Sequence, residues 1–125
     1  MTTFSKVKDV LEQANTDCER LRLEADARLQ GAQDAEGYRA KLVERAQIVA
    51  ALGKKVEPLL GNSPAELDLY HRILTLAGTA EHALKEYEQD QSGTLGLGVI
   101  LHYRDDTTND PNRLERLVEL AGKLS

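Results

Sequence analysis

Four side chains with acid–base or ligand chemistry lie in one segment of the sequence, residues 63–89. Asp68 and His71 are three residues apart, and His82 and Lys85 repeat that spacing further along the chain. Residues at this spacing share one face of an α-helix. In a helix the two histidines point in the same direction but lie about 16 Å apart, at a rise of 1.5 Å per residue. A single metal ion therefore cannot bind both histidines.

The run His82-Ala83-Leu84-Lys85 indicates a different chemistry. It resembles the His-x-Leu-Lys-Gly signature of histidine phosphotransfer domains, which are four-helix bundles of about this length. The resemblance implies that His82 accepts a phosphoryl group and that Lys85 lies beside that anion. Glu86 stands where the family has its glycine, and a carboxylate at that position repels a phosphoryl group. Phosphotransfer through His82 is one alternative function.

A metal site built from carboxylates and histidines is a second alternative. Helical bundles that hold two iron ions use two Glu-x-x-His motifs and two further glutamates. This chain contains Asp68-x-x-His71 but no Glu-x-x-His, no Gly-x-Ser-x-Gly and no clustered glutamates. We therefore expect no catalytic, cofactor-binding or metal-binding residues, no cofactor and no enzymatic activity.

The segment that carries these side chains has a well-defined helix start. Ser63 can cap the first turn, Glu66 can reach back to the Ser63 amide, and Pro64 fits the first helical position. The apolar stripe that follows is wide, which is typical of a helix that packs against more than one neighbour. Its excess apolar surface predicts a homodimer. We expect the association face to contain Leu69, Tyr70, Leu76 and Tyr87.

Composition and periodicity together predict an all-α protein. The chain has 125 residues, only 4% aromatic residues and only three prolines, so leucine, valine, isoleucine and alanine must build the core. That length corresponds to a single domain, residues 1–125. We predict a bundle of three long antiparallel helices that pack along their whole length, followed by a short C-terminal helical segment. The predicted ranges are about 3–30, 35–60, 64–90 and 111–124.

The first predicted helix has an apolar stripe at spacings of three and four residues, formed by Phe4, Val7, Leu11, Ala14, Cys18, Leu21 and Ala25. Two residues in the predicted stripes need an explanation. Cys18 is the only cysteine, and its place in the stripe of the first helix predicts a buried, unreactive thiol. Arg45 lies on the stripe of the second helix. We expect its head either to reach the edge of the bundle or to pair with an acidic residue of a neighbouring helix. An anion site at Arg45 is the less favoured interpretation.

Two boundaries stay open at this level. Gly31 and Gly37 bracket a change in apolar phase, which favours a turn there over one continuous helix through residue 60. Residues 90–98 are rich in glycine and are predicted to be a flexible hinge. Residues 95–104 fit either a short helix starting near Thr94 or a strand. The chain offers no other strand for pairing, so we predict the short helix.

The charge distribution restricts the class of partner. The net charge is −5, the isoelectric point is near 5.2, and residues 63–92 alone carry −4. Because neutralising phosphates needs a basic face, this acidity argues against a nucleic-acid partner. No apolar run approaches the length of a bilayer span, and no secretion leader is visible, so we expect a cytoplasmic protein without a membrane partner. The predicted function is a protein–protein interaction module, such as an adaptor, chaperone-like subunit or regulatory scaffold.

Overall fold

The computed structural model describes residues 3–31, 33–90, 94–101 and 110–125, and every regular element in these ranges is helical. The prediction of an all-α protein is therefore confirmed. In chain order the elements are α1 (Thr3–Gln30), α2 (Ala35–Ala50), α3 (Leu52–Val56), the 3₁₀ helix η1 (Glu57–Leu59), α4 (Pro64–Gln89), α5 (Thr94–Gly98) and α6 (Arg113–Leu124).

A tight turn separates α1 from α2, as the change in apolar phase predicted. The backbone amide of Gly31 donates to the carbonyl of Ala27 (2.9 Å) and that of Asp34 to Arg28 (2.8 Å). Gln33 adopts a positive φ of 51°, which reverses the chain direction. The Asp34 side chain then caps α2 by accepting from the Gly37 amide at 2.9 Å. A continuous helix through residue 60 is excluded.

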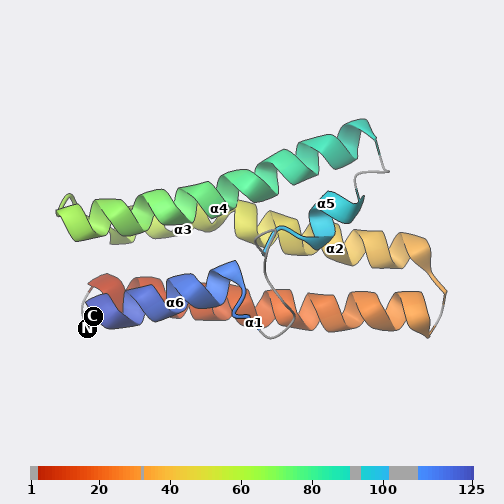
Figure 1. The fold of residues 1–125 in the computed structure, drawn as a ribbon, viewed down its shortest axis with the longest axis horizontal. Helices are drawn as coiled ribbons and strands as arrows, with labels where there is room; N and C mark the ends of the chain where they lie inside the picture. Colours follow the sequence, from red (N-terminus) through yellow and green to blue (C-terminus); the bar gives the residue numbers. More distant parts are fainter. Residues whose placement is uncertain (1–2, 32, 91–93, 102–109) are drawn as a thin grey trace.

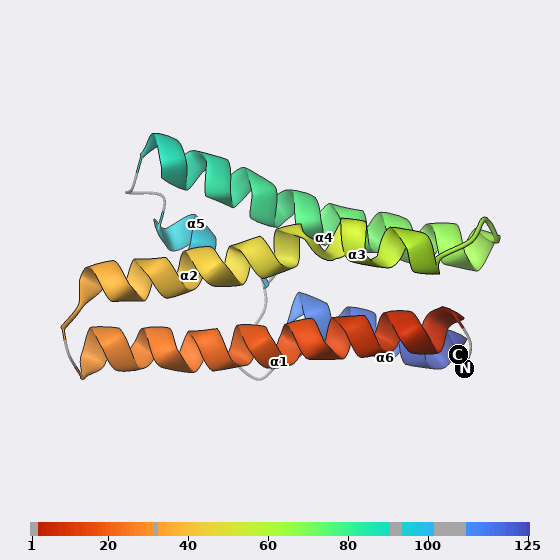
Figure 2. The same cartoon turned by 180° about the vertical axis from the view of Figure 1, so that it is seen from behind.

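The predicted second helix is interrupted rather than continuous. It forms α2, is broken at Ala51, resumes as α3 and ends as the 3₁₀ helix η1. Pro58 lies in η1 and offers no amide hydrogen for an α-helical bond, which explains why the α-helix ends just before it. Gly53 allows α3 to pack closely on α4, because a Cβ atom there would lie 2.8 Å from a methyl carbon of Leu74. The segment keeps one overall direction despite these breaks (Figures 1 and 2).

The start of α4 follows the sequence prediction. The Ser63 hydroxyl accepts from the Glu66 amide at 3.3 Å and donates to the Glu66 carboxylate at 2.7 Å. The same carboxylate also accepts from the Gly61 amide. These hydrogen bonds lower the pKa of Glu66, with the Ser63 side chain as the largest cause. Local sequence chemistry is sufficient to define this boundary.

The C-terminal part of the chain confirms the short helix that was predicted to start near Thr94, but it differs from the prediction in two other places. Residues 94–98 form α5 and residues 99–101 a turn, so the strand interpretation is wrong for this part, and so is the flexible hinge over 94–98. The remainder of the hinge (91–93) and of the 95–104 segment (102–104) lies outside the described residues. Helix α6 begins two residues later than predicted. Its cap is Asn112, which forms a capping box with Glu115.

The helices form an elongated bundle whose two ends are filled differently. Helices α1 and α2 form an antiparallel hairpin, and α4 returns alongside α2 and α3 (Figures 1 and 2). The C-terminal half of α4 diverges from α2, and α5 occupies the space between them. Helix α6 packs on the other half of α1 and also contacts α4. The prediction that three long helices pack on one another along their whole length is therefore wrong where α5 separates α4 from α2.

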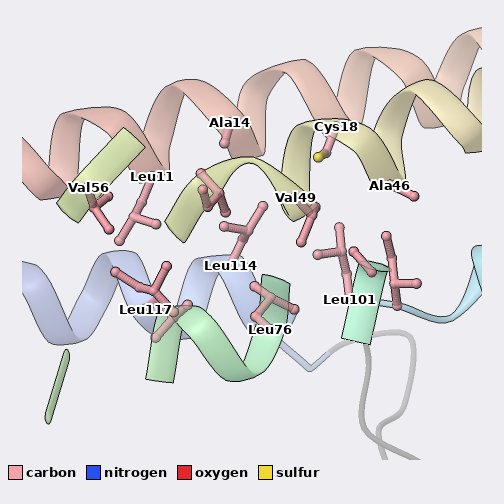
Figure 3. Packing of buried hydrophobic residues seen from close by; sticks show 14 of the residues in the cluster. Leu11, Ala14, Cys18, Ala46, Val49, Val56, Leu76, Leu101, Leu114 and Leu117 are labelled. Atoms are coloured by element: carbon pink, nitrogen blue, oxygen red, sulfur yellow. The ribbon is translucent and has the colours of Figure 1, made fainter. Parts of the chain in front are cut away.

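One set of buried side chains joins all of these helices. The stripe of α1 is buried as predicted from Val7 to Ala25, and α6 contributes Leu114 and Leu117 to the same core. Figure 3 shows α1, α3, α4 and α6 meeting in this core, with Leu11 and Val56 near Leu117. Helix α6 buries Leu114, Leu117 and Ala121 and contacts both α1 and α4, so it joins these two long helices.

Two glycine positions give opposite predictions for an added methyl group. A Cβ atom at Gly37 would clash with the Oδ2 atom of the Asp34 carboxylate, whose Oδ1 atom caps α2, whereas one at Gly78 would meet nothing within 4 Å. Gly78→Ala should raise the free energy of unfolding by about 0.5–1 kcal/mol, because alanine is the better helix former. The free energy of unfolding of Gly37→Ala should be about 1–2 kcal/mol lower than that of Gly78→Ala, because the added methyl group displaces the capping side chain of Asp34. Urea denaturation followed by circular dichroism measures both, and equal stabilisation by the two substitutions would contradict the cap geometry.

Candidate functional site

The four polar residues singled out on α4 all lie on its solvent face, but the structure does not bring them into one site. Asp68 pairs with Arg72 at 2.9 Å, and His82 pairs through Nε2 with Glu86 at 3.0 Å. The ring of His71 lies beside that of Tyr70, at a centroid distance of 6.4 Å. Lys85 is exposed. These are separate helical surface contacts.

This geometry gives little support to either alternative function, phosphotransfer through His82 or a metal site built from carboxylates and histidines. The side chain of His82 is 74% exposed, as a phosphoryl acceptor must be, but the Glu86 carboxylate lies at its Nε2 atom. Phosphotransfer therefore stays a prediction. The Glu86 carboxylate at Nε2 of His82 would repel a phosphoryl group that approaches this atom. For the metal alternative, no group of three or more His, Cys, Asp or Glu side chains within the described ranges is placed to hold a metal ion.

The four apolar residues expected to form an association face do not lie together on the surface of α4. Leu69 and Leu76 are fully buried in the chain's own core, so in this conformation neither is available to a partner. Tyr70 and Tyr87 are half-buried against the same core. The leucines of α4 that face solvent are Leu67 (41% exposed) and Leu74 (39% exposed). The stripe of α4 is so wide that the sequence alone did not distinguish its inner from its outer side.

The N-terminal half of α4 and the adjacent α6 form a basic groove. It has a volume of about 440 Å³, and three guanidinium groups line it together with Thr75 and three leucines. Arg113 donates to the Thr79 hydroxyl at 3.2 Å, which connects α6 to α4. We call this set the basic groove. Its residues are Arg72, Thr75, Leu76, Arg113, Arg116, Leu117 and Leu120.

The C-terminal half of α4 carries the opposite charge. Glu81, Glu86 and Glu88 are exposed there, with Lys85 as the one base among them. Gly78 lies between the two halves, is exposed, and has no atom within 4 Å of the place where a Cβ would be. Arg72 therefore lies at one end of the outer face of α4, beside the two arginines of α6 and paired with the exposed Asp68. The three glutamates lie toward the other end, and Gly78 leaves the middle bare.

Arg45 has a partner that sequence reasoning missed. It is only 5% exposed, and its Nη2 atom donates to the backbone carbonyls of Leu97 (2.9 Å) and Gly98 (3.0 Å). Neither a position at the bundle edge nor an acidic partner accounts for it. The positive charge lies against the C-terminal carbonyls of α5, where the peptide dipoles favour a cation. Burial lowers the pKa of Arg45 below its usual value.

Arg45 also borders two polar cavities. The larger, about 510 Å³, is formed by α1, α2, the turn after α5 and the start of α6. A second cavity of about 220 Å³ shares Arg22 and Arg45 with it and extends toward Tyr38. No sequence motif marks this site, because its residues come from segments far apart in the chain. The larger cavity is lined by Asn15, Cys18, Glu19, Arg22, Arg45, Leu101, Asp110, Asn112 and Glu115.

Comparison with protein-family models, curated proteins and solved structures finds no match to this chain. Among the residues that the structure describes, no helix is both long enough and apolar enough to cross a membrane. Functional conclusions must therefore come from the surfaces and cavities themselves.

Substitution of Arg45 should release α5. Arg45→Met keeps the apolar stem but leaves the carbonyls of Leu97 and Gly98 without their donor, so the free energy of unfolding should fall by about 2–3 kcal/mol. Hydrogen exchange followed by mass spectrometry should accelerate in the peptide covering residues 94–101. Arg39→Met, on the same helix, is the control and should leave exchange there unchanged. Unaltered protection of this peptide in Arg45→Met would contradict the proposed role.

The thiol of Cys18 should be unreactive in the folded protein. Burial raises its pKa from 9.0 to about 11, so the nucleophilic thiolate is scarce near neutral pH. A disulfide reagent should label it slowly in buffer and rapidly in denaturant. Because the folded pKa is the higher one, the stability that the neutral thiol contributes is complete below about pH 9 and is lost as the pH rises towards 11. Cys18→Ala should flatten this alkaline part of the stability curve, and rapid labelling of the native protein would refute the burial argument.

Proposed function

We propose that this protein is a helical protein–protein interaction module that acts by packing rather than catalysis, and that it associates with a second copy through the outer face of α4. The supporting observation is that Arg72 and two arginines of α6 lie at one end of that face, whereas Glu81, Glu86 and Glu88 lie toward the other end. When two copies of α4 meet antiparallel, the arginines at one end of each copy lie against the glutamates of the other copy. A two-fold interface uses the same surface of both subunits, so every favourable contact occurs twice.

The residue spacing on α4 selects one register for this pairing. Arg72, Thr75, Thr79, His82 and Glu86 follow one another at spacings of three and four residues, so they share one side of the outer face. An antiparallel pair centred on Thr79 places Arg72 opposite Glu86 of the second copy. A register shifted by about one turn, centred on residue 77, would place Asp68 opposite Glu86 instead. Like charges in that register disfavour it.

Exposed apolar and small residues complete the face. Leu67 and Leu74 are the large apolar side chains that α4 leaves partly in solvent. Gly78 follows Leu74 by one turn and presents bare backbone, with nothing packed against it. A glycine inside an exposed helix costs about 1 kcal/mol relative to alanine, so its presence has no benefit for the isolated helix. Close approach of a second helix offers a use for it.

The available area sets the expected strength of the dimer. Helix α4 has 26 residues, which corresponds to a length of about 39 Å, and a helix is about 10–12 Å wide. The resulting face of roughly 400 Å² is about half of what each partner buries in a standard stable interface. Arg113 and Arg116 of α6 extend it at one end. We therefore expect reversible dimerisation with a dissociation constant in the micromolar range.

Charge exchange across the interface tests the register. Arg72→Glu and Glu86→Arg should each weaken dimerisation by about tenfold, because each substitution places like charges together twice in the symmetric dimer. The double variant should restore most of the affinity, since the charges are exchanged but complementary. Sedimentation velocity over a micromolar concentration series measures this, with circular dichroism as a check on folding.

Lys123→Glu is the matched control, because it reverses an exposed charge on α6 that pairs with Glu119 at 3.4 Å outside the basic groove. It should leave the dissociation constant unchanged. A wild-type protein that remains monomeric at tens of micromolar would overturn the proposed function. A double variant as weak as the single ones would overturn the register.

A further inference from the structure

His82 is bound to the glutamate that the proposed dimer uses for its contact with Arg72. The Nε2 atom of His82 lies 3.0 Å from a carboxylate oxygen of Glu86, which follows it by one turn of α4. The His82 side chain is 74% exposed and that of Glu86 is 56% exposed, so both are accessible to a second copy. The charge of His82 therefore acts on the charged contact that defines the register of the dimer.

The charged groups of the same chain that surround His82 belong to α4 and α6. On α4, Glu81 precedes it, and Lys85 and Glu86 lie one turn further on. Arg113 of α6 binds, at 3.2 Å, the α4 hydroxyl that lies one turn before His82. Helix α5 packs on this half of α4 and contains no charged residue, whereas α2 and α3 pack against the buried side of α4, away from the exposed His82 ring. In the isolated chain the charges around His82 are therefore mixed.

The second copy adds positive charge beside His82. A register centred on Thr79 places His82 opposite residue 76, so the outward side chains that it meets belong to the turns from Arg72 to Thr79 of the second copy. Arg113 of the second copy lies at the same place, because it donates to the Thr79 hydroxyl. Association therefore brings two guanidinium groups towards each His82.

Protonation of His82 weakens the contacts of the dimer in two ways. Histidine takes up a proton between about pH 8 and about pH 5. The protonated ring neutralises Glu86 within its own chain, which reduces the attraction of Glu86 for Arg72 of the second copy. The added positive charge also repels the guanidinium groups of the second copy. Both effects occur twice, because the dimer is symmetric.

His71, the other histidine of α4, acts in the opposite direction but less directly. The same register places it opposite Tyr87 of the second copy, between Glu86 and Glu88. A proton on His71 therefore favours association, through charges on the neighbours of the residue that it faces. His82 has the larger effect, because its ring already lies at the Glu86 carboxylate.

We propose that the α4 dimer is regulated by pH and that protonation of His82 dissociates it. This inference rests on the dimer proposed above. Protonation and association oppose each other, so the affinity is complete where His82 is neutral, above about pH 7.5, and decreases as the pH falls.

Sedimentation velocity at about pH 7.5 and about pH 5.5, at equal ionic strength, tests this regulation. The dissociation constant of the wild-type dimer should rise by about threefold on acidification, and that of His71→Gln by about fivefold, because the opposing histidine is removed. His82→Gln keeps a polar side chain but cannot take up a proton. Its dissociation constant should match that of the wild type at the higher pH and should not rise at the lower one. Circular dichroism checks that each variant is folded at both pH values.

The outcomes separate this inference from the proposed function. A protein that is monomeric at both pH values overturns the dimer and its regulation together. A wild-type dimer with the same dissociation constant at both pH values overturns the regulation alone. An equal rise in His82→Gln and the wild type would also overturn it, because the response would then come from other groups.

Discussion

The hydrogen bonds from Arg45 to the carbonyls of Leu97 and Gly98 hold the C-terminal part of the chain in its place. Helix α5 has only five residues, too few for a stable helix on its own. It nevertheless buries Leu97, and the turn after it buries Ile100 and Leu101. A cation at its C-terminus compensates carbonyls that would otherwise be buried without donors. The apolar contacts and the guanidinium therefore depend on each other.

This attachment also explains the shape of the bundle. Where α4 diverges from α2, α5 fills the gap, and at the opposite end α6 fills the corresponding space against α1 (Figures 1 and 2). Two short helices thus provide the fourth layer that three long helices lack. Because both lie against the inner side of α4, the outer side of that helix is left to solvent. The surface that we propose for association is a consequence of this packing.

The sequence was sufficient where local chemistry decides the structure. The stripe from Val7 to Ala25 and the cap at Ser63 were predicted correctly, because periodicity and capping depend on neighbouring residues alone. The position of α5 was not predictable, since the carbonyls that bind Arg45 belong to a distant segment and any residue type supplies a carbonyl. The basic groove was missed for a similar reason: Arg72 and Arg113 meet only after α6 has packed on α4. Leu69 and Leu76 were expected on an association face but are buried in the chain's own core. The apolar stripe of α4 is so wide that the sequence does not show which part of it faces the core.

Cysteine crosslinking tests the central claim, association of two α4 helices through their outer faces, most directly. In a Cys18→Ala background, Gly78→Cys places one thiol at the exposed centre of that face, close to the symmetry axis of the predicted dimer. Ala27→Cys places a thiol at an exposed position on α1 as the control. Under mild oxidation at micromolar concentration, Gly78→Cys should form a covalent dimer efficiently and Ala27→Cys should not. Equal and slow crosslinking of the two variants would contradict the account.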